Sequence, residues 1–483
     1  MASIALAPER PRGGLFRPVE RQEWIKLANW LLVWIVLANA GFAMMWLIGA
    51  PPRWAEILFI GAMGLVVRER SRAVQIVAFC LAMAWSVLGF LAGLFNLGMA
   101  SLLYSLKFFV ELNPVQSSEY TIGAAVIVVL IGLAVAALRR PQHFTDVRLV
   151  FLAMIVVLLF AGVDKWMGLG MRGHYKREAV AGAPFSSAVS RSHFGAAVGA
   201  APRHLLVVMV ESMGQPVGNA EMQRLLFARY RRPGVTGRFA LESGTTTYYN
   251  STTAGEVREL CGRWGDYYDL LERDDDGCLP ARLRDRGFET SAYHSFTGDF
   301  FERAAWYPNI GFEHRVFADK LIGQGLEECG GVFPGACDRE VPRVLAARLK
   351  QAERPQFVYW LTVNSHLPVP PDRNLDVENC ERISPKLAAE YPMICRQFAL
   401  WDQIDAALVK EITAADFPPT DILIVGDHMP PYFDRHHRSQ FAPVDPAIVA
   451  GCARRSFVRA CRRRPPPRPC STARASRSWR AIS

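Results

Sequence analysis

The sequence predicts a two-part protein. An N-terminal polytopic α-helical membrane domain of about five spans is followed by an α/β domain with a mostly parallel sheet covered by helices. Hydrophobic residues make up 51% of the 483 residues, and the mean hydropathy of +0.11 is too high for an ordinary soluble enzyme. Long apolar runs are confined to the first third of the chain, and short apolar runs alternating with helix-like segments occupy the rest.

The membrane domain is expected at residues 27–163, after a cytoplasmic N-terminus at residues 1–26. A helix needs about 20 residues to cross a hydrocarbon core of ~30 Å. The first and third apolar runs meet this length, the fourth and fifth are marginal, and the second is short and contains Glu56. In order, the runs are residues 27–48, 54–67, 74–94, 121–138 and 149–163.

The distribution of basic residues supports five spans. If all five runs cross the membrane, the only basic residues in the two short outer loops are Arg53 and Lys107. By the positive-inside rule, this distribution places the N-terminus in the cytoplasm and everything after Val163 outside. If residues 54–67 instead form a buried or interfacial segment, the later loops invert and the asymmetry is lost. No cleavable signal peptide is expected, because the first apolar run is too long. The basic residues on the inner side are Arg10, Arg12, Arg17, Arg21, Lys26, Arg68, Arg70, Arg72, Arg139, Arg140 and Arg148.

The net charge of +10 does not indicate nucleic-acid binding. Residues 451–483 contain ten Arg and no acidic residue, so the remaining chain has equal numbers of basic and acidic residues, 45 of each. A neutral body argues against nucleic acid as a partner.

The outer domain is expected at residues 204–445, after a linker rich in Gly, Ala and Ser at residues 164–203 that could include a helix along the membrane surface. Four apolar, β-branched or aromatic runs in this domain predict parallel strands covered on both faces. Each run ends in ionisable residues: Glu211, His294, His366, and the pair Asp427 and His428. Because ligands bind at the carboxyl ends of strands in open α/β sheets, we expect these side chains to converge.

Six cysteines form three sequence-local pairs in the outer domain, which suits disulfides in an oxidising compartment. The pairs are Cys261 with Cys278, Cys329 with Cys337, and Cys380 with Cys395, although the sequence alone does not fix connectivity. A zinc cluster is the alternative, but no C-x-x-C spacing supports it.

Glu211, Asp427 and His428 supply two carboxylates and an imidazole, a set that suits a divalent cation such as Mn²⁺ or Zn²⁺. A hydroxyl bound to such a cation loses its proton near neutral pH, which would let a threonine attack phosphorus. "STTAGE" at residues 251–256 provides two threonines at a helix start, where backbone N–H groups favour an anion. The plain structural interpretation, with residues 251–253 as an N-cap and Glu256 completing a capping box, is compatible with this role.

Several motifs occur in a known order. "VVMVESMG", the threonine of "TTAGE", "HSFTGDFFERAAWYPNIGF", "VNSHLP" and "VGDHMP" resemble the alkaline phosphatase/sulfatase superfamily over roughly residues 25–445. They are most similar to its membrane-anchored branch of lipoteichoic acid synthases, phosphoglycerol transferases and phosphoethanolamine transferases. The resemblance implies an alkaline-phosphatase-like (sulfatase) fold for the outer domain.

The resemblance also implies roles for particular residues. Glu211, Thr253, Asp427 and His428 would form the shell of one divalent metal ion, with Thr253 as the nucleophile and Thr252 as the alternative one residue away. His294, Arg303 and His366 would hold the phosphoryl group and the leaving or incoming oxygen. His436 and His437 are either part of a second metal site or a substrate site, or an ordinary pair of surface histidines.

The motifs leave the transferred headgroup open. The "ES" after the first strand resembles lipoteichoic acid synthases, whereas the local cysteine pairs resemble phosphoethanolamine transferases. The Cys/Ser-x-Pro-x-Arg motif of sulfatases does not occur at the nucleophile position, which argues against sulfate-ester hydrolysis.

The expected activity is therefore transfer of phosphoethanolamine or phosphoglycerol from a membrane phospholipid to a periplasmic glycan or lipid acceptor, through a phospho-threonine ester. The protein would be integral to the bacterial inner membrane, with its catalytic domain on the periplasmic side. A metal-dependent phosphatase or phosphodiesterase, and an inactive membrane protein with a disrupted C-terminus, are the alternatives. The basic segment at residues 446–483 is either a disordered tail or the product of a shifted reading frame near residue 445, and its composition favours the second.

Overall fold

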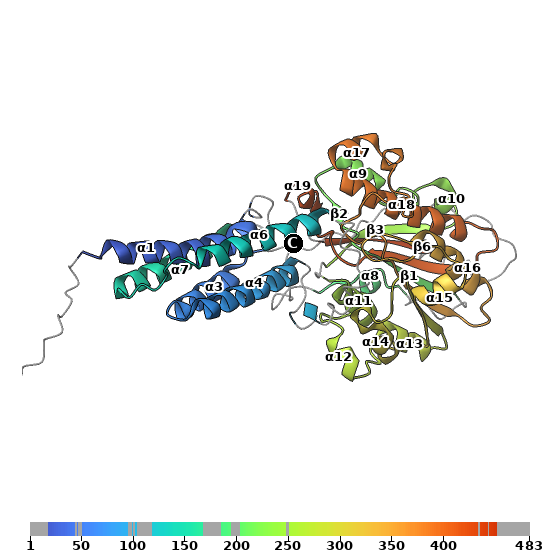
Figure 1. Cartoon of the computed structure of the whole chain (residues 1–483). Helices are drawn as coiled ribbons and strands as arrows, with labels where there is room; N and C mark the ends of the chain where they lie inside the picture. Colours follow the sequence, from blue (N-terminus) through green and yellow to red (C-terminus); the bar gives the residue numbers. More distant parts are fainter. Residues whose placement is uncertain are drawn as a thin grey trace, which may run out of the picture. The chain divides into compact units, whose positions relative to one another are not determined.

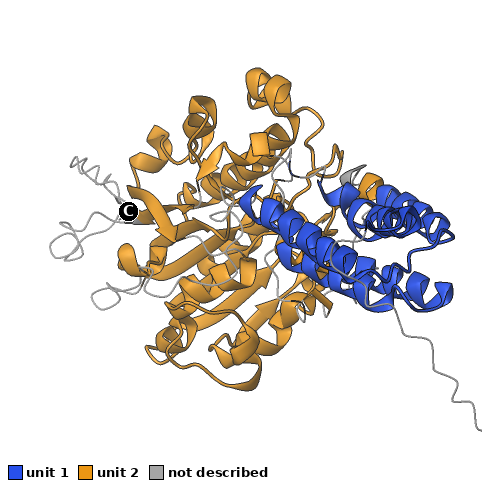
Figure 2. Ribbon diagram, turned by 90° about the vertical axis from the view of Figure 1, so that its left-hand side faces the viewer, with its two compact units in different colours: residues 1–46, 52–87, 124–167 blue, residues 47–51, 88–123, 168–483 orange. Residues whose placement is uncertain are grey.

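In the computed structural model, the chain forms two compact units (Figure 2). The first contains residues 1–46, 52–87 and 124–167, and the second contains residues 47–51, 88–123 and 168–483. The structure describes residues 18–43, 46, 51–94, 99, 102–103, 118–167, 185–194, 203–247, 251–432, 435–442 and 444–451.

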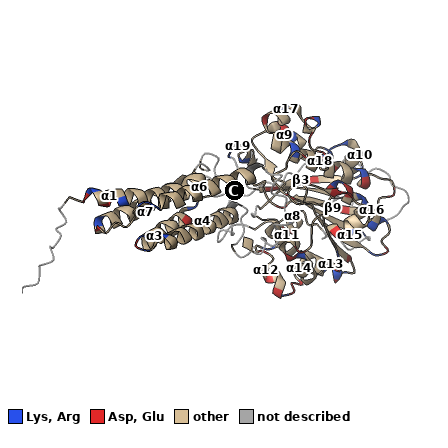
Figure 3. Ribbon diagram, in the orientation of Figure 1, with Lys and Arg blue, Asp and Glu red and all other residues tan. Residues whose placement is uncertain are grey.

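Within the described residues, each of the five apolar runs contains a helix. By length and composition, three of the helical segments can cross a membrane: Arg21–Ala43, Arg72–Gly93 and Val147–Met167. Trp54–Val67 and Thr121–Ala137 are shorter apolar helices. The ribbon of these helices in Figure 3 is mostly tan, with few positions coloured as Lys, Arg, Asp or Glu, as a hydrocarbon environment requires. The helices are α1 (Arg21–Leu31) continuing through η1 (Leu32–Leu37) into α2 (Ala38–Ala43), α3 (Trp54–Val67), α4 (Arg72–Leu94), α6 (Ser118–Ala137) and α7 (Val147–Met167).

Two glycines let helix α3 approach its neighbours closely. A Cβ atom on Gly61 would lie 2.6 Å from Val157 of α7, and one on Gly64 would lie 2.5 Å from the ring of Trp34 in η1. Small residues at such positions are typical of helix packing in membranes, where van der Waals contact drives association. The short run at residues 54–67 is therefore a packed member of the first unit.

A seven-stranded sheet forms the centre of the second unit, in the order β3-β11-β9-β1-β8-β4-β5 (Figure 1). The four predicted strands pair in parallel, as β9 with β1, β1 with β8, and β8 with β4. Strands β5 (His314–Val316), β3 (Ala240–Thr247) and β11 (Val444–Gly451) were not predicted, and β11 runs antiparallel to both β3 and β9. The predicted four are β1 (His204–Val210), β4 (Glu289–His294), β8 (Gln356–Leu361) and β9 (Thr420–Gly426).

Both faces of the sheet are buried, which explains why its central strands are continuously apolar. Leu206, Val208 and Val210 of β1 pack toward helices α16 and α18, whereas Leu205 and Val207 pack toward α11, α13 and α14. Figure 1 shows the two helical layers on opposite sides of the strands. The helices of this unit are α8 (Ala188–Arg191), α9 (Ala220–Leu225), α10 (Pro233–Thr236), α11 (Thr252–Cys261), α12 (Tyr268–Glu272), α13 (Leu279–Arg284), α14 (Arg303–Asn309), α15 (Ala318–Gly323), α16 (Val341–Lys350), α17 (Pro385–Glu390), α18 (Pro392–Ile412) and α19 (Arg435–Arg438). Two further two-residue strand pairings complete it, with β2 (Gln215–Pro216) beside β10 (Phe441–Ala442) and β6 (Glu328–Cys329) beside β7 (Gly335–Ala336).

The three local cysteine pairs form disulfides, as predicted. They join Cys261 to Cys278, Cys329 to Cys337 and Cys380 to Cys395. Because these sulfur atoms are oxidised, they supply no thiolates, and the zinc-cluster alternative fails for these six residues.

Elements of the second unit occur beyond both predicted edges of the outer domain. Part of the predicted linker belongs to the domain, since Ala188 and Val189 of α8 are buried and their backbone N–H groups donate to Glu259. Helix α8 therefore packs into the domain, whereas residues 168–184 and 195–202 of the predicted linker lie outside the described residues, so the expected helix along the membrane surface stays a prediction. At the other edge, β11 extends the sheet to Gly451, six residues beyond the predicted boundary at residue 445. The rest of the basic segment, residues 452–483, lies outside the described residues.

Candidate functional site

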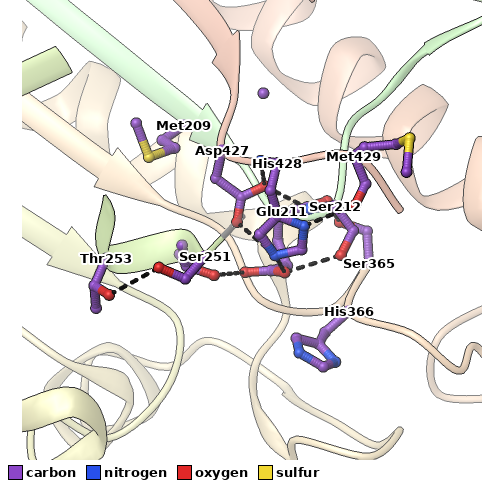
Figure 4. A network of polar contacts seen from close by, with 12 residues as sticks. Met209, Glu211, Ser212, Ser251, Thr253, Ser365, His366, Asp427, His428 and Met429 are labelled. Atoms are coloured by element: carbon purple, nitrogen blue, oxygen red, sulfur yellow. Dashed lines mark hydrogen bonds and ion pairs between the residues drawn. The ribbon is translucent and has the colours of Figure 1, made fainter. Parts of the chain in front are cut away.

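The predicted site residues at the ends of the strands lie at one edge of the sheet. Strands β9, β1, β8 and β4 are consecutive neighbours and parallel, so the residues after their carboxyl ends are brought together. Figure 4 shows Glu211, His366, Asp427 and His428 side by side.

Glu211, Asp427 and His428 form a compact cluster. Their ligand-type atoms all lie within 4.8 Å of one another. His428 Nε2 lies 3.2 Å from Glu211 Oε1 and 3.4 Å from Asp427 Oδ2. All three side chains are buried, with Asp427 fully inaccessible. Buried carboxylates at this spacing repel each other unless a cation or a proton lies between them.

The cluster meets the requirements of a divalent cation site. Asp427 Oδ1 accepts hydrogen bonds from the backbone N–H groups of Ser212 (2.7 Å) and His428 (2.6 Å), whereas its buried Oδ2 has no hydrogen-bond partner among the residues that the structure describes. His428 Nδ1 faces the carbonyl oxygen of Met429 at 2.9 Å, which assigns the proton to Nδ1 and leaves Nε2 as the ligand atom. A carboxylate oxygen that accepts no hydrogen bond and an oriented imidazole nitrogen are suitable donors for Mn²⁺ or Zn²⁺.

Without a cation, these groups compete for protons. Burial disfavours the charged imidazolium of His428, but the carboxylates of Asp427 and Glu211 outweigh it and raise its pKa to about 10. Burial and the negative charge of Glu211 raise the pKa of Asp427 well above its usual value. A bound cation would take the place of these protons.

The N-terminus of helix α11 brings a threonine hydroxyl to the cluster. Ser251 caps the helix, since its Oγ accepts a hydrogen bond of 3.2 Å from the backbone N–H of Ala254. The hydroxyl of Thr252 donates to Glu211 Oε2 at 3.2 Å. The hydroxyl of Thr253 instead lies 3.3 Å from Ser251 Oγ and also contacts the carboxyl of Asp266.

The geometry therefore favours Thr252, the alternative nucleophile, over Thr253. Successive residues in a helix point about 100° apart, so only one of two adjacent threonines can face a given group. In Figure 4 the hydroxyl of Thr253 is directed at Ser251 and has no dashed line to Glu211.

Helix α11 is pressed against the backbone of the Asp427 loop. A Cβ atom on Gly255 would lie 2.6 Å from the carbonyl oxygen of Asp427, so only glycine allows this approach. Arg258, one turn later on the same face, donates to the carbonyl oxygens of Gly426 (2.7 Å) and Asp427 (3.3 Å) and to the carboxylate of Asp445 (2.5 Å). These contacts fix Thr252 relative to the cluster, and the sequence did not reveal Gly255, Arg258 or Asp445 as site residues.

The loop after β8 holds both His366 and Glu211. Thr362 Oγ1 accepts from the backbone N–H of Glu211 at 2.9 Å, and Ser365 Oγ donates to the carbonyl oxygen of Glu211 at 2.7 Å. Asp338 also stabilises this loop, because its Oδ2 accepts hydrogen bonds from the backbone N–H groups of Val363 (2.9 Å) and Asn364 (2.7 Å).

His366 lies beside the cluster, as predicted. Its Nδ1 faces the carbonyl oxygen of Leu367 at 2.8 Å, and its ring packs against Phe333 with centroids 4.3 Å apart. Burial lowers its pKa and the charge of His428 adds to this effect, while Glu211 partly opposes it. A neutral imidazole at this position can accept a proton.

His294 is also buried near the cluster. Its Nδ1 faces the carbonyl oxygen of Leu361 at 3.1 Å, and its Nε2 has no partner in the described part of the chain. Burial and the nearby positive charge of Arg303 lower the pKa of His294 to about 3, so the ring is neutral at physiological pH.

Arg303 is paired with Glu256 in the core, and its role as a substrate ligand stays a prediction. Its side chain is buried, with Nε and Nη2 donating to Glu256 Oε2 at 3.0 and 2.9 Å and Nη1 donating to the carbonyl oxygen of Phe300. Glu256 also accepts from the hydroxyls of Tyr307 (2.5 Å) and Tyr359 (3.0 Å). Glu256 therefore forms no capping box, because the cap is Ser251, whose capping-box partner would be residue 254, and Glu256 is instead paired in the core.

His436 and His437 lie on α19, away from the three-residue cluster. The ring of His436 stacks on Tyr391 with centroids 4.9 Å apart, and that of His437 packs against Tyr391 and Tyr432. Neither histidine belongs to a group of three or more ligand-type side chains within the described residues. The geometry gives no support to a second metal site of that size.

A search of curated proteins gives no significant match. Among solved structures, the lipoteichoic acid synthase LtaP from Listeria monocytogenes is 15% identical, with a TM-score of 0.40 over 54% of this chain and 67% of that one. The phosphoglycerol transferase GacH from Streptococcus pyogenes is 16% identical, with a TM-score of 0.36 over 52% and 69% of the two chains. The phosphoethanolamine transferase EptA from Neisseria meningitidis is 13% identical, with a TM-score of 0.47 over 90% and 89%.

These likenesses are distant, and the assignment rests on a family model. The Sulfatase model matches residues 204–446, which is half of the chain. This match confirms the superfamily predicted from the motifs and includes Glu211, Thr252, His366, Asp427 and His428. The chain therefore belongs to the sulfatase family.

Proposed function

We propose that this protein is a metal-dependent phosphotransferase that moves a phospho-alcohol headgroup from a membrane phospholipid to a periplasmic glycan or lipid, with Thr252 as the nucleophile. The observation that carries the proposal is the hydrogen bond from the Thr252 hydroxyl to Glu211 within the buried carboxylate and imidazole cluster. The motifs that resemble the membrane-anchored branch of the superfamily supply the class of substrate.

One divalent cation, Mn²⁺ or Zn²⁺, would be held by Glu211, Asp427 and His428, with the Thr252 oxygen completing the set. When bound, such a cation lowers the pKa of a hydroxyl and neutralises charge that develops on phosphoryl oxygens. Asp427 Oδ2, which accepts no hydrogen bond from the described residues, and the oriented His428 Nε2 support this assignment.

The protein side chains then carry two displacement steps. In the first, Thr252 Oγ loses its proton and attacks phosphorus, the bond from phosphorus to the diacylglycerol oxygen breaks, and that oxygen takes up a proton. In the second, an acceptor hydroxyl loses its proton and attacks the same phosphorus, the Thr252 ester bond breaks, and Thr252 regains a proton. Both steps conserve the phosphodiester charge, so no oxidant or reductant is needed.

The surrounding groups support this chemistry. The first backbone N–H groups of α11 provide partial positive charge beside Thr252, which favours the anionic phosphoryl group. His366 is placed to accept the proton of the attacking alcohol or to return it to the leaving one. His294 offers a buried neutral nitrogen at the same edge of the sheet.

The membrane helices and the disulfides support a periplasmic site on an inner-membrane protein. Three described helices are long enough to anchor the chain in a bilayer, where the lipid donor is found. Three disulfides in the catalytic domain suit an oxidising compartment.

The test is to incubate the full chain in detergent with Mn²⁺ or Zn²⁺ and mixed phosphatidylethanolamine and phosphatidylglycerol, with and without a sugar acceptor, and to measure diacylglycerol and headgroup products. We expect diacylglycerol release that Thr252→Val abolishes, with the headgroup recovered on the acceptor. Release of the phospho-alcohol or of phosphate only into water would replace transfer with hydrolysis. Absence of any product from a cation-loaded wild-type chain would contradict the proposal.

A further inference from the structure

One buried glutamine contacts the loops that follow three different strands of the site. Gln397 lies on α18 and its side chain is fully buried. Its amide nitrogen donates to the carbonyl oxygens of Ser365 (3.1 Å) and Ser212 (3.4 Å), and its amide oxygen accepts from the hydroxyl of Tyr432. Both N–H groups of the Gln397 amide and one of the two lone pairs on its oxygen are therefore used in hydrogen bonds.

The contacted residues adjoin the candidate metal ligands and His366. Ser212 follows Glu211, Ser365 precedes His366, and Tyr432 lies four residues after His428. Helix α18 supplies no ligand-type side chain to the cluster, so Gln397 acts on the site only through the backbone and Tyr432.

Ser212 shows why such support is needed. Its φ of 54° lies in the left-handed region, which is unfavourable for residues other than glycine. Its backbone N–H donates to Asp427 Oδ1, its hydroxyl donates to Glu211 Oε1 at 2.9 Å, and its carbonyl oxygen accepts from Gln397. Ser212 thus links two of the candidate metal ligands in a conformation that hydrogen bonds on both sides maintain.

We propose that Gln397 is a positioning residue that holds the loops of Glu211, His366 and His428 in the geometry of the cation site. This inference rests on the proposed function for its role in catalysis, although its effect on geometry is independent of the reaction. A carboxylate in place of the amide would face two carbonyl oxygens with no proton to donate. An apolar side chain of similar size would leave both buried carbonyl oxygens without this donor.

The test compares Gln397→Glu and Gln397→Met with a matched control on the same helix. Gln403 also donates its amide nitrogen to two backbone carbonyl oxygens, those of Leu375 and Asp376, both at 3.0 Å, in a loop that carries no candidate site residue. Gln403→Glu therefore makes the same chemical change away from the cluster. Each full-length variant is compared in detergent for Mn²⁺ affinity by calorimetry and, in metal-free form, for hydrogen exchange of peptides covering residues 208–216 and 362–368.

We expect Gln397→Glu to weaken Mn²⁺ binding by roughly 10–100-fold, as for other outer-shell partners of metal ligands, and to speed exchange in both peptides. Gln403→Glu should change Mn²⁺ affinity less than about 3-fold, within the range of substitutions away from the site. The affinity of Gln397→Glu relative to wild type should recover as the pH falls, because a protonated glutamic acid can donate one hydrogen bond in place of the amide. A purely structural role would not give this pH profile.

Wild-type Mn²⁺ affinity together with wild-type exchange in Gln397→Glu would overturn the inference, as would equal losses in Gln397→Glu and Gln403→Glu. Failure of the proposed function is distinguishable. If the wild-type chain binds Mn²⁺ but transfers no headgroup, the proposed reaction is wrong. The difference in Mn²⁺ affinity between Gln397→Glu and Gln403→Glu still decides the role of Gln397. If the wild-type chain binds no Mn²⁺, the exchange comparison in the metal-free protein decides it.

Discussion

The hydroxyl of Thr252 donates a hydrogen bond of 3.2 Å to Glu211, whereas that of the adjacent Thr253 faces Ser251 at 3.3 Å. The two side chains differ by one position on the first turn of α11, and only the first points into the cluster of Glu211, Asp427 and His428. The proposed nucleophile therefore depends on helix phase, which the close packing of Gly255 and Arg258 against the Asp427 loop fixes.

Removing the Thr252 hydroxyl should stop the reaction. We expect Thr252→Val to lower the rate of diacylglycerol release by ~10³-fold or more, because no other side chain takes over the role of a removed nucleophile. Thr252→Ser should retain measurable activity, since it keeps the oxygen. The matched control is Thr253→Val, for which a loss of less than about 10-fold is expected. Equal losses in the two valine variants would contradict the assignment.

Cation binding should depend on Asp427. In Asp427→Asn one ligand oxygen is replaced by an amide nitrogen that cannot bind a cation, so we expect Mn²⁺ affinity to fall by more than ~100-fold, beyond the effect of an outer-shell change. Calorimetry on the full chain measures this directly. Asp402, which pairs with Arg229 at 2.6 Å outside the site, provides the control. If Asp402→Asn and Asp427→Asn reduce affinity to the same extent, the cluster is not the cation site.

The close approach of α11 to the Asp427 loop should tolerate no added methyl group. In Gly255→Ala the new Cβ would lie 2.6 Å from a backbone carbonyl oxygen, which must shift. We expect a loss of about 1–3 kcal/mol in the free energy of unfolding, together with weaker Mn²⁺ binding. Gly323→Ala in helix α15 is the control, because its Cβ would meet no atom within 4 Å. The control should be neutral or slightly stabilising in the same thermal unfolding measurement.

Arg303 should matter for stability through Glu256. Arg303→Met leaves the buried Glu256 carboxylate without its cation, and we expect a loss of roughly 3–5 kcal/mol in the free energy of unfolding. The double variant Glu256→Gln/Arg303→Met should recover part of this loss, because the uncompensated charge is gone. A double variant that is as unstable as the sum of the two single changes would show that the pair does not interact.

The ordered alternation of apolar strands and helices was sufficient to predict the central part of the outer domain. Continuous apolar runs in β1, β4, β8 and β9 signal strands buried on both faces, and ionisable residues at their ends signal a site at one edge. Strands β3 and β11 carry polar residues and Gly or Pro, as in "LESGTTT" and "VDPAIVAG", so their pairing depends on tertiary contacts that local pattern does not report. Because β11 was not recognised as a strand for this reason, the end of the domain was predicted at residue 445.

Site residues at strand ends could be found from sequence, but those on helices could not be oriented. His366 and the three cluster residues follow strands, where the sheet fixes their position. Choosing between Thr252 and Thr253 requires the phase of helix α11. The pairing of Arg303 could not be predicted, because the sequence does not show that Glu256 is buried opposite it. Gln397, Arg258 and Asp338 act through backbone atoms of distant loops, for which a single sequence contains no local signal.

The most direct test of the central claim is the mass of one tryptic peptide. Full-length protein is incubated with Mn²⁺ or Zn²⁺ and phospholipid, quenched in acid and digested, and the peptide Phe239–Arg258 is fragmented to locate any added group. The account predicts a phosphoethanolamine or phosphoglycerol ester on Thr252, retained in Thr253→Val and absent in Thr252→Val. An ester on Thr253, or an unmodified peptide at every quench time in a protein that binds the cation and consumes phospholipid, would contradict it.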